Sequence, residues 1–342
     1  KTSERFTYYT FVANLFESEN NLDDAIKARI ESLKYSTKPE DRVLALSQMV
    51  NSFLSNMDAR LDLYDLQLAQ ELNKQELNIM TPIGYRMRSR VATAKKNNVL
   101  AEELLLKALD ASERSNSELE RVLSLWSLSD FYRDTVQHEK RLAVVKKGYA
   151  FTPRSLPFYY VHFRLVLAWE SFKDHKYIGM DKVLREALDC LMVNDYYYQA
   201  EARSFMAEAL RNTGRSPLGE KYASDAVAIM KNKRVSPADF ILYLRSLVIL
   251  GYAQHDSGKI ALSQQTMQKL LTESPQITAG SIESVFKARM FLYECQKDAG
   301  QITRAGSMLA QIKRDFSQLQ PEVLRLHGEK LFREYKDRAR VN

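Results

Sequence analysis

Residues 248–275 read VILGYAQHDSGKIALSQQTMQKLLTESP, with Gly251 and Gly258 seven residues apart and Pro275 at the far end. Apolar residues recur at helical spacing on both sides of Gly258, which predicts two short helices joined by a turn. Proline lacks a backbone N–H and is tolerated near helix boundaries, so Pro275 predicts the end of the unit. The stretch therefore predicts one helical hairpin.

The same arrangement recurs along the chain at a spacing of roughly 40 residues. A first helix has apolar residues at relative positions 4, 7, 8 and 11, a turn follows near position 15, and a second helix has small or apolar residues at positions 20, 24, 27 and 28. The pattern is strong over 122–312 and weaker over 43–115. The units begin near residues 6, 43, 82, 122, 161, 200, 244 and 286.

Composition agrees with an all-α protein. The 342 residues include only 11 glycines and 8 prolines, and residues that lose little entropy in a helix are plentiful. A single hairpin cannot bury its apolar face, so stacked hairpins are expected to share a continuous core.

The pattern resembles the tetratricopeptide repeat (TPR), although that repeat has about 34 residues. Longer units of this kind are similar to the TPR-like sensor arrays of bacterial signalling proteins and transcription activators. A HEAT-like array, with a period of roughly 40 to 47 residues, is the alternative, and the Leu-Gly, Gly and Pro spacing favours TPR. The resemblance implies a right-handed superhelical solenoid of about eight helix-turn-helix repeats over residues 1–320. Residues 321–342 are expected to form a C-terminal capping or linker helix.

Several functional classes have no support in the sequence. The five histidines form no HExxH or His-Cys arrangement, and no glycine-rich phosphate loop ending in GK[ST] occurs, so we expect neither an enzyme nor a bound metal or cofactor. Cys190 and Cys295 are expected to be buried and unpaired. The longest apolar stretch, FILYLRSLVILGYA, is interrupted by Arg245, so membrane attachment would need a flanking segment. A chain that opens on Lys1 is expected to be part of a larger protein, in the cytoplasm or the periplasm.

A basic stretch, YRMRSRVATAKK (residues 85–96), raises the question of nucleic acid. Arg86 and Arg90 can share a helix face that attracts phosphates. The alternative is a solvated surface with counter-charges from a neighbouring unit. No aromatic residues interleave the cations as a single-strand binder requires, and the formal net charge of +7 is mild, so the alternative is favoured.

The resemblance also implies a binding surface. In TPR arrays the first helices line the inner groove, and positions 2, 5, 9, 12 and 13 of each unit point into it. Both tryptophans of the chain fall at such positions, and tryptophan is enriched where proteins bind partners. The alternative is that both indoles pack against adjacent helices. The groove residues implied in this way are Trp126, Asp130, Arg133, Trp169, Phe172, Lys173, Glu208, Arg211, Asn212, Tyr252 and His255.

The first hypothesis is a non-enzymatic scaffold or sensor region of a bacterial signal-transduction protein, which binds a protein or peptide segment in its groove. The second is a sensor of a small molecule or signal peptide that regulates an attached diguanylate cyclase or DNA-binding domain. A nucleic-acid-binding helical repeat is the third and least favoured.

Overall fold

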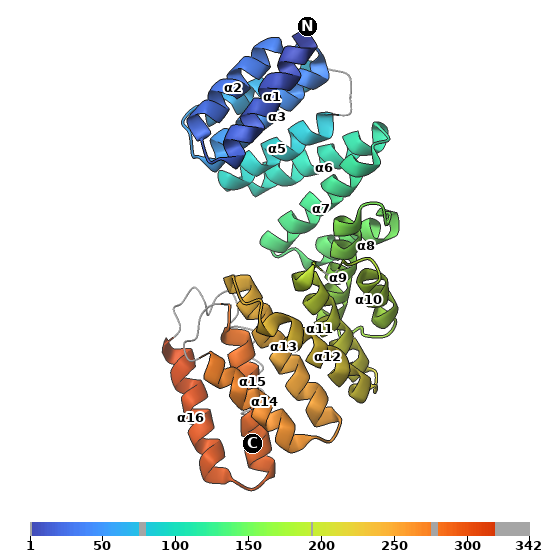
Figure 1. Ribbon diagram of the computed structural model, residues 1–342, viewed down its shortest axis with the longest axis vertical. Helices are drawn as coiled ribbons and strands as arrows, with labels where there is room; N and C mark the ends of the chain where they lie inside the picture. The colour runs from blue at the N-terminus through green and yellow to red at the C-terminus, as the bar shows by residue number, and fades with distance from the viewer. Residues whose placement is uncertain (1, 75–79, 193, 275–279, 319–342) are drawn as a thin grey trace. The chain divides into compact units, whose positions relative to one another are not determined.

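The computed structural model describes residues 2–74, 80–192, 194–274 and 280–318, and every regular element in these ranges is an α-helix (Figure 1). The helices alternate between the first and second member of a hairpin, as the repeat predicts. In chain order they are α1 (Thr2–Ser18) and α2 (Leu22–Tyr35), α3 (Pro39–Ser55) and α4 (Leu61–Lys74), α5 (Thr81–Ala94) and α6 (Asn98–Arg114), α7 (Glu118–Asp134) and α8 (His138–Phe151), α9 (Pro157–Lys173) and α10 (Met180–Leu188), α11 (Tyr196–Asn212) and α12 (Ser216–Lys231), α13 (Pro237–Asp256) and α14 (Ile260–Glu273), α15 (Ile282–Asp298) and α16 (Ile302–Gln318).

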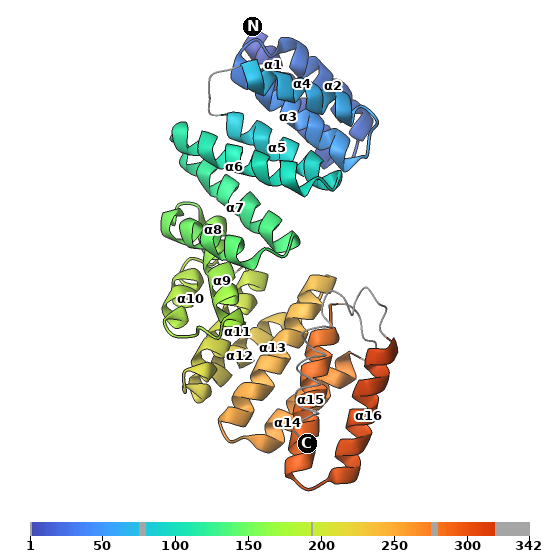
Figure 2. The same ribbon diagram turned by 180° about the vertical axis from the view of Figure 1, so that it is seen from behind.

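The prediction of about eight helix-turn-helix repeats is confirmed for the described residues. The weakly patterned stretch 43–115 forms regular hairpins as well, with α3 on α4 and α5 on α6 (Figure 2). First helices also pack on the next first helices, as α11 does on α13 and α13 on α15. Pro275 and the expected C-terminal helix over 321–342 lie outside the described residues.

The chain divides into two compact units, Lys1–Phe163 and Arg164–Asn342, with the division inside α9. Unit 1 has apolar clusters between α3, α4 and α5, centred on Val43, Leu46 and Leu68. A cluster of unit 2 lies between α11, α12, α13, α14 and α15 and includes the fully buried Tyr243 and Met267. Each unit therefore has a core of its own.

Each of the eight described hairpins closes with a residue in the left-handed region. At the turn after α13, the N–H of Lys259 donates to the carbonyl oxygen of Gln254 at 2.8 Å, which satisfies the end of the helix. Glycine adopts positive φ without a steric penalty, whereas a β-branched residue is strained there. The closing residues are Asn20, Met57, Lys96, Val136, His175, Gly214, Gly258 and Gly300.

Small residues at positions 8 and 20 allow close packing of the helices, as predicted. A Cβ atom on Gly251 would lie 2.7 Å from Cε of Met267 on α14. A Cβ atom on Gly219 would lie 2.9 Å from the backbone oxygen of Ala207. Both distances are too short for a carbon contact, so a larger side chain would push the hairpin apart.

Prolines and a capping serine mark the N-terminal ends of several helices. Pro39, Pro82, Pro217 and Pro237 stand in the first turn of a helix, where no backbone N–H is needed. Ser236 accepts from the N–H of Asp239, and the Asp239 carboxylate accepts from the N–H of Ser236, which makes a capping box.

Two further expectations concern cysteine and membranes. Cys190 and Cys295 are unpaired, as predicted, but both are partly exposed, so the prediction of full burial was wrong. Each stands near the C-terminal end of a hairpin helix, where solvent reaches the side chain.

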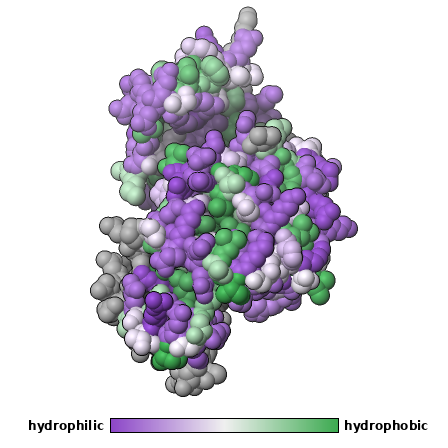
Figure 3. Space-filling view, turned by 60° about the horizontal axis from the view of Figure 1, so that its bottom comes forward, coloured by the Kyte–Doolittle hydropathy of each residue, from purple (hydrophilic) through white to green (hydrophobic). Residues whose placement is uncertain are grey.

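None of the helices in the described ranges is long and apolar enough to cross a bilayer. In the space-filling view of Figure 3, hydrophilic residues cover most of the face shown, with hydrophobic residues in smaller groups between them.

Candidate functional site

The first helices of unit 2 place a set of polar, charged and aromatic side chains on one face. Residues 201, 205, 208 and 212 of α11 are spaced by three or four, so they share a face of the helix. Residues 245, 252 and 256 of α13 follow the same register, one repeat later. We call this set, together with Trp169 and Lys173 of α9, the first-helix surface of unit 2.

Trp169 is half-buried and lies at the centre of an aromatic and cationic cluster. Its ring stacks on Phe205 of α11, with centroids 5.9 Å apart and an interplanar angle of 29°. The guanidinium carbon of Arg245 lies 4.5 Å from the centroid of Trp169 and 4.3 Å from that of Phe205. Nζ of Lys173 lies 5.7 Å from the Trp169 centroid. Two cations at the ring faces are held by cation–π attraction as well as by packing.

Arg245 is the exception in a buried stretch of α13. Between Leu242 and Gly251 every residue of α13 is buried except Arg245, whose side chain is 28% exposed. The nearest acid is Glu201, with 4.0 Å between Nη1 of Arg245 and Oε1 of Glu201. That separation is too long for a hydrogen bond. Burial raises the pKa of the Glu201 carboxyl, and Arg245 opposes this shift.

The next part of the first-helix surface is a network of polar side chains that bond to one another. Arg211 of α11 donates to Asp256 of α13 at 3.0 Å and to Glu208 at 3.2 Å, and its guanidinium lies 5.3 Å from the Tyr252 ring centroid. Asn212 donates to the backbone oxygen of Glu208. Nη1 and Nη2 of Arg211 are therefore bonded to acids of the chain itself, whereas its buried Nε has no hydrogen-bond partner among the described residues.

Other groove residues predicted for unit 2 have mixed surroundings. Phe172 is buried, with its ring 5.8 Å from Phe205 and 5.0 Å from Tyr177. Lys173 donates to both oxygens of Glu170 at 3.0 and 3.1 Å. His255 lies 5.3 Å from the Phe291 ring and is partly exposed.

Unit 1 holds a separate aromatic cluster around Trp126 of α7. The indole lies edge-on to Tyr159 at 5.3 Å, to Phe158 at 5.8 Å and to the imidazole of His162 at 6.1 Å, all in the first turns of α9. Nε2 of His162 is buried and makes no hydrogen bond. Burial lowers the pKa of His162 to about 4, and the charges of Arg141 and Arg133 add to the effect.

Beside this cluster, Asp130 and Arg133 pair with each other. Nη1 of Arg133 lies 2.8 Å from Asp130, and Nε lies 2.8 Å from Asp134. Burial raises the pKa of Asp130, and the charge of Arg133 opposes the shift. The predicted groove residues Trp126, Asp130 and Arg133 thus lie together on α7, and the arginine is already bound.

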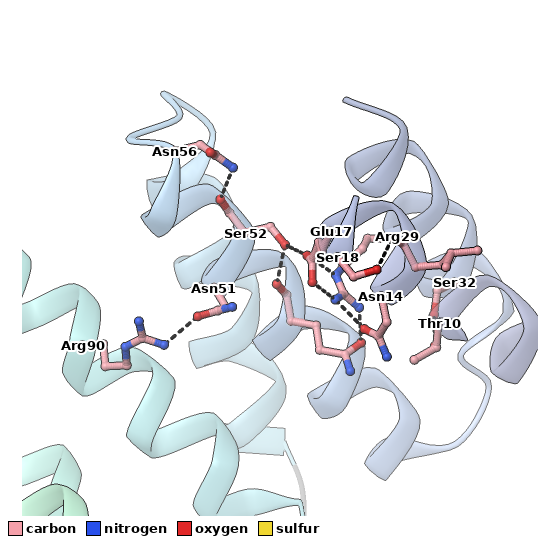
Figure 4. Close-up of polar contacts among 12 residues, drawn as sticks. Thr10, Asn14, Glu17, Ser18, Arg29, Ser32, Asn51, Ser52, Asn56 and Arg90 are labelled. Carbon is pink, nitrogen blue, oxygen red and sulfur yellow. Dashed lines mark hydrogen bonds and ion pairs between the residues drawn. The ribbon is translucent and has the colours of Figure 1, made fainter. Parts of the chain in front are cut away.

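The first helices at the N-terminus carry another closed network, shown in Figure 4. Arg29 of α2 is almost fully buried and donates to both carboxylate oxygens of Glu17 at 3.1 and 2.7 Å. It also donates to Asn14 at 2.9 Å and to Gln48 at 2.7 Å. Ser52 donates to Glu17 from α3. These bonds use the polar side chains of α1, so no charged group of this network is left to bind a ligand.

The basic stretch 85–96 is paired with acids and amides of neighbouring helices. Arg86 is bound to Glu120 at 2.5 Å, Arg88 to Asp65 at 3.1 Å and Arg90 to Asn51 at 2.6 Å. Lys95 is bound to Asp62. These pairs agree with the interpretation that the stretch is a surface whose charges are balanced by neighbouring units.

Three residues of these clusters were not among the predicted groove residues, although the position rule contains them. His162, Glu201 and Arg245 each stand at position 2 of a unit, and position 2 was expected to face the groove. A tryptophan in a predicted groove is a stronger sequence signal than a single charge, because tryptophan is enriched at binding sites. No group of three or more His, Cys, Asp or Glu side chains suited to a metal occurs in the part of the chain that the structure describes.

Comparison with solved structures independently supports the fold. No protein-family model matches the sequence, and no curated protein matches it. Solved structures do match. A signal transduction ATPase with numerous domains (STAND) and a tetratricopeptide repeat sensor, PH0952 from Pyrococcus horikoshii, has a TM-score of 0.66 and 16% identity, over 83% of this chain and 44% of that protein. The chain therefore spans less than half the length of PH0952.

Two further structures cover nearly the whole of both chains. The apo form of RapI has a TM-score of 0.62 and 10% identity, over 93% of this chain and 98% of RapI. The apo form of the quorum sensor NprR from B. thuringiensis has a TM-score of 0.56 and 11% identity, over 98% and 97%. At such identities the likeness establishes the fold alone. The chain is a TPR-like helical array whose structure resembles the repeat regions of sensor proteins.

Proposed function

We propose that this TPR-like array is a non-enzymatic sensor scaffold that binds a peptide segment on the first-helix surface of unit 2. The observation that carries the proposal is the cluster of Trp169, Phe205 and Arg245 on three successive first helices. A half-buried indole offers a large rigid surface, and the adjacent cation supplies a directional polar contact.

The arrangement suits an extended peptide better than a compact ligand. Aromatic and polar side chains continue from Trp169 on α9 through Glu208 on α11 to Tyr252 on α13. An extended chain rises by about 3.3 Å per residue, so three helices spaced by roughly 9 Å would be crossed by about six residues. NprR has been solved in complex with its cognate peptide NprX, at a TM-score of 0.50 and 13% identity, over 85% of this chain and 83% of NprR. That complex gives the proposal a precedent on the same fold.

Capture of peptides tests the proposal. A pool of random hexapeptides is passed over immobilised protein, and the retained peptides are counted by mass spectrometry. Trp169→Ala is expected to reduce retention at least tenfold, while circular dichroism stays helical. Tyr222→Ala on the second helix α12 is the matched control and should retain peptides as the parent does. Equal retention by Trp169→Ala and parent would contradict the proposal, and loss of helicity would make Trp169 a core residue.

The proposal includes an attached output domain, as expected for sensor arrays of signalling proteins. PH0952 combines a repeat sensor with further domains, which supports this part. Sequencing the gene on both sides of the codons for Lys1 and Asn342 tests it. A diguanylate cyclase or DNA-binding domain in the same reading frame would agree with the proposal. Stop and start codons at these positions would contradict it and favour a free-standing scaffold.

A further inference from the structure

The arginines of the predicted binding surfaces differ in what their N–H groups do. Arg133 is bonded to Asp130 and Asp134, and Arg211 is bonded to Glu208 and Asp256. Among the described residues, the N–H groups of Arg245 have no hydrogen-bond partner, and the acid paired with them is Glu201 at 4.0 Å, beyond hydrogen-bond distance. A guanidinium has five N–H donors, and a protein arginine normally finds partners for them. The Arg245 side chain is 28% exposed, so a ligand can reach its N–H groups.

The rings beneath Arg245 orient it. Its guanidinium lies over Trp169 at 4.5 Å and over Phe205 at 4.3 Å from the centroids. Contacts of this kind use the face of the guanidinium, whereas its N–H groups lie in the plane and stay available. The neighbouring residues of α13 are buried, so the backbone that carries Arg245 is fixed. The donors are thus presented in a nearly fixed direction, which lowers the entropic cost of binding.

We infer that Arg245, with the rings of Trp169 and Phe205 beneath it, is a subsite for a carboxylate group of the bound peptide. The inference rests on the proposed peptide-binding function and names the chemistry that this surface recognises. A planar carboxylate accepts two parallel N–H bonds from one guanidinium. Phosphate sites gather several cations, and here the second nearby cation, Lys173, is bonded to Glu170. A carboxylate therefore fits the available donors better than a phosphate.

Glu201 and Tyr197 lie near Arg245. Both lie close enough to Arg245 to feel its charge. Burial raises the pKa of the Glu201 carboxyl, which weakens its competition for the arginine. Glu201 is still the acid paired with Arg245, so removing its carboxylate should strengthen binding of a ligand carboxylate.

The test uses a small probe, so that it does not depend on finding the natural peptide. Trp126→Phe leaves Trp169 as the only tryptophan, whose indole N–H signal is followed by NMR. N-acetylglycine should shift this signal with a dissociation constant on the order of millimolar, whereas N-acetylglycinamide should bind at least tenfold more weakly. In the same background Arg245→Met should lose the difference between acid and amide, and Glu201→Gln should bind N-acetylglycine severalfold more tightly. Arg215→Met is the control, because Arg215 is bonded to Asp181 away from this surface.

Equal responses to the acid and the amide, or an unchanged response of Arg245→Met, would overturn the subsite. The source of the carboxylate is distinguished by three acetylated pentapeptides: one of alanine with a free C-terminus, one amidated with a central Glu, and one amidated with a central Gln. Tight binding of the first assigns a C-terminal carboxylate, and tight binding of the second assigns an acidic side chain. Retention of random peptides that ignores Arg245 would refute the subsite while leaving the proposed function intact. Binding of N-acetylglycine at Arg245 without any retention of peptides would refute the proposed function while showing that Arg245 binds a carboxylate.

Discussion

His162 makes the stability of unit 1 depend on pH in a calculable way. The pKa of its imidazole is lowered from 6.5 to about 4 by burial against Trp126, Phe158 and Tyr159, with the charges of Arg141 and Arg133 adding to the effect. The unfolded chain takes up a proton below pH 6.5, and the folded chain does not until about pH 4. Stability from this group is therefore present above pH 6.5 and lost as the pH falls towards 4.

The magnitude follows from the two pKa values. Between pH 7.5 and 5.0 the unfolded state gains about 2 kcal/mol relative to the folded state through this single group, and about 3 kcal/mol by pH 4. His162→Leu removes the titration and the buried Nε2 that has no partner. The free energy of unfolding of the parent, minus that of His162→Leu, should fall by about 2 kcal/mol between the two pH values.

Urea denaturation followed by tryptophan fluorescence measures this difference. A Trp169→Phe background leaves Trp126 as the reporter, 6.1 Å from the imidazole. Phe151→Leu, which changes packing in unit 1 without a titrating group, is the control and should differ from the parent equally at both pH values. A parent–variant difference for His162→Leu that stays constant from pH 7.5 to 5.0 would refute the reasoning.

Three substitutions in unit 1 test its packing and turns. Val136→Gly should stabilise the protein by about 0.5–1 kcal/mol in urea denaturation, because Val136 is exposed at a φ of 58° and glycine relieves the strain; destabilisation would refute this account of the turn. Arg29→Met should cost about 3–5 kcal/mol, because it leaves the carboxylate of Glu17 without its buried partner; a cost under about 1 kcal/mol would show that the network is not energetically important. Gly148→Ala should cost about 1–3 kcal/mol, because the added Cβ would lie 2.3 Å from the ring of Phe163; an unchanged melting temperature would show that α8 and α9 separate without penalty.

The fold was predictable because its signal is repeated. One hairpin with Gly251 and Gly258 is weak information, but a similar pattern repeated about every 40 residues, clear over 122–312 and weaker over 43–115, leaves few other architectures. The close contact of Gly219 with the Ala207 carbonyl oxygen shows the physical reason: a small residue is needed where the two helices of this hairpin approach most closely.

The candidate site was predictable only in part. The sequence places Arg133, Arg211 and Arg245 on first helices, but it does not show that two of them are bonded to acids. Asp256 reaches Arg211 from the next repeat, 45 residues later, and such a pair depends on packing between hairpins. Likewise, the sequence left open whether Trp169 packs or binds, and in the structure the ring contacts Phe205 while remaining partly exposed. Which polar groups stay available is a property of the packed array.

The left-handed turns divide the hairpins into two classes that should differ in local unfolding. The first five hairpins close on a residue with a side chain, whereas the last three close on Gly214, Gly258 and Gly300. Opening a turn releases strain in the first class and none in the second, so the cost of opening is lower by about 1 kcal/mol. Amide hydrogens at the helix ends around Val136 should accordingly exchange with solvent several times faster than those around Gly258. The turn residues thus predict lower local stability at the first five hairpins than at the last three.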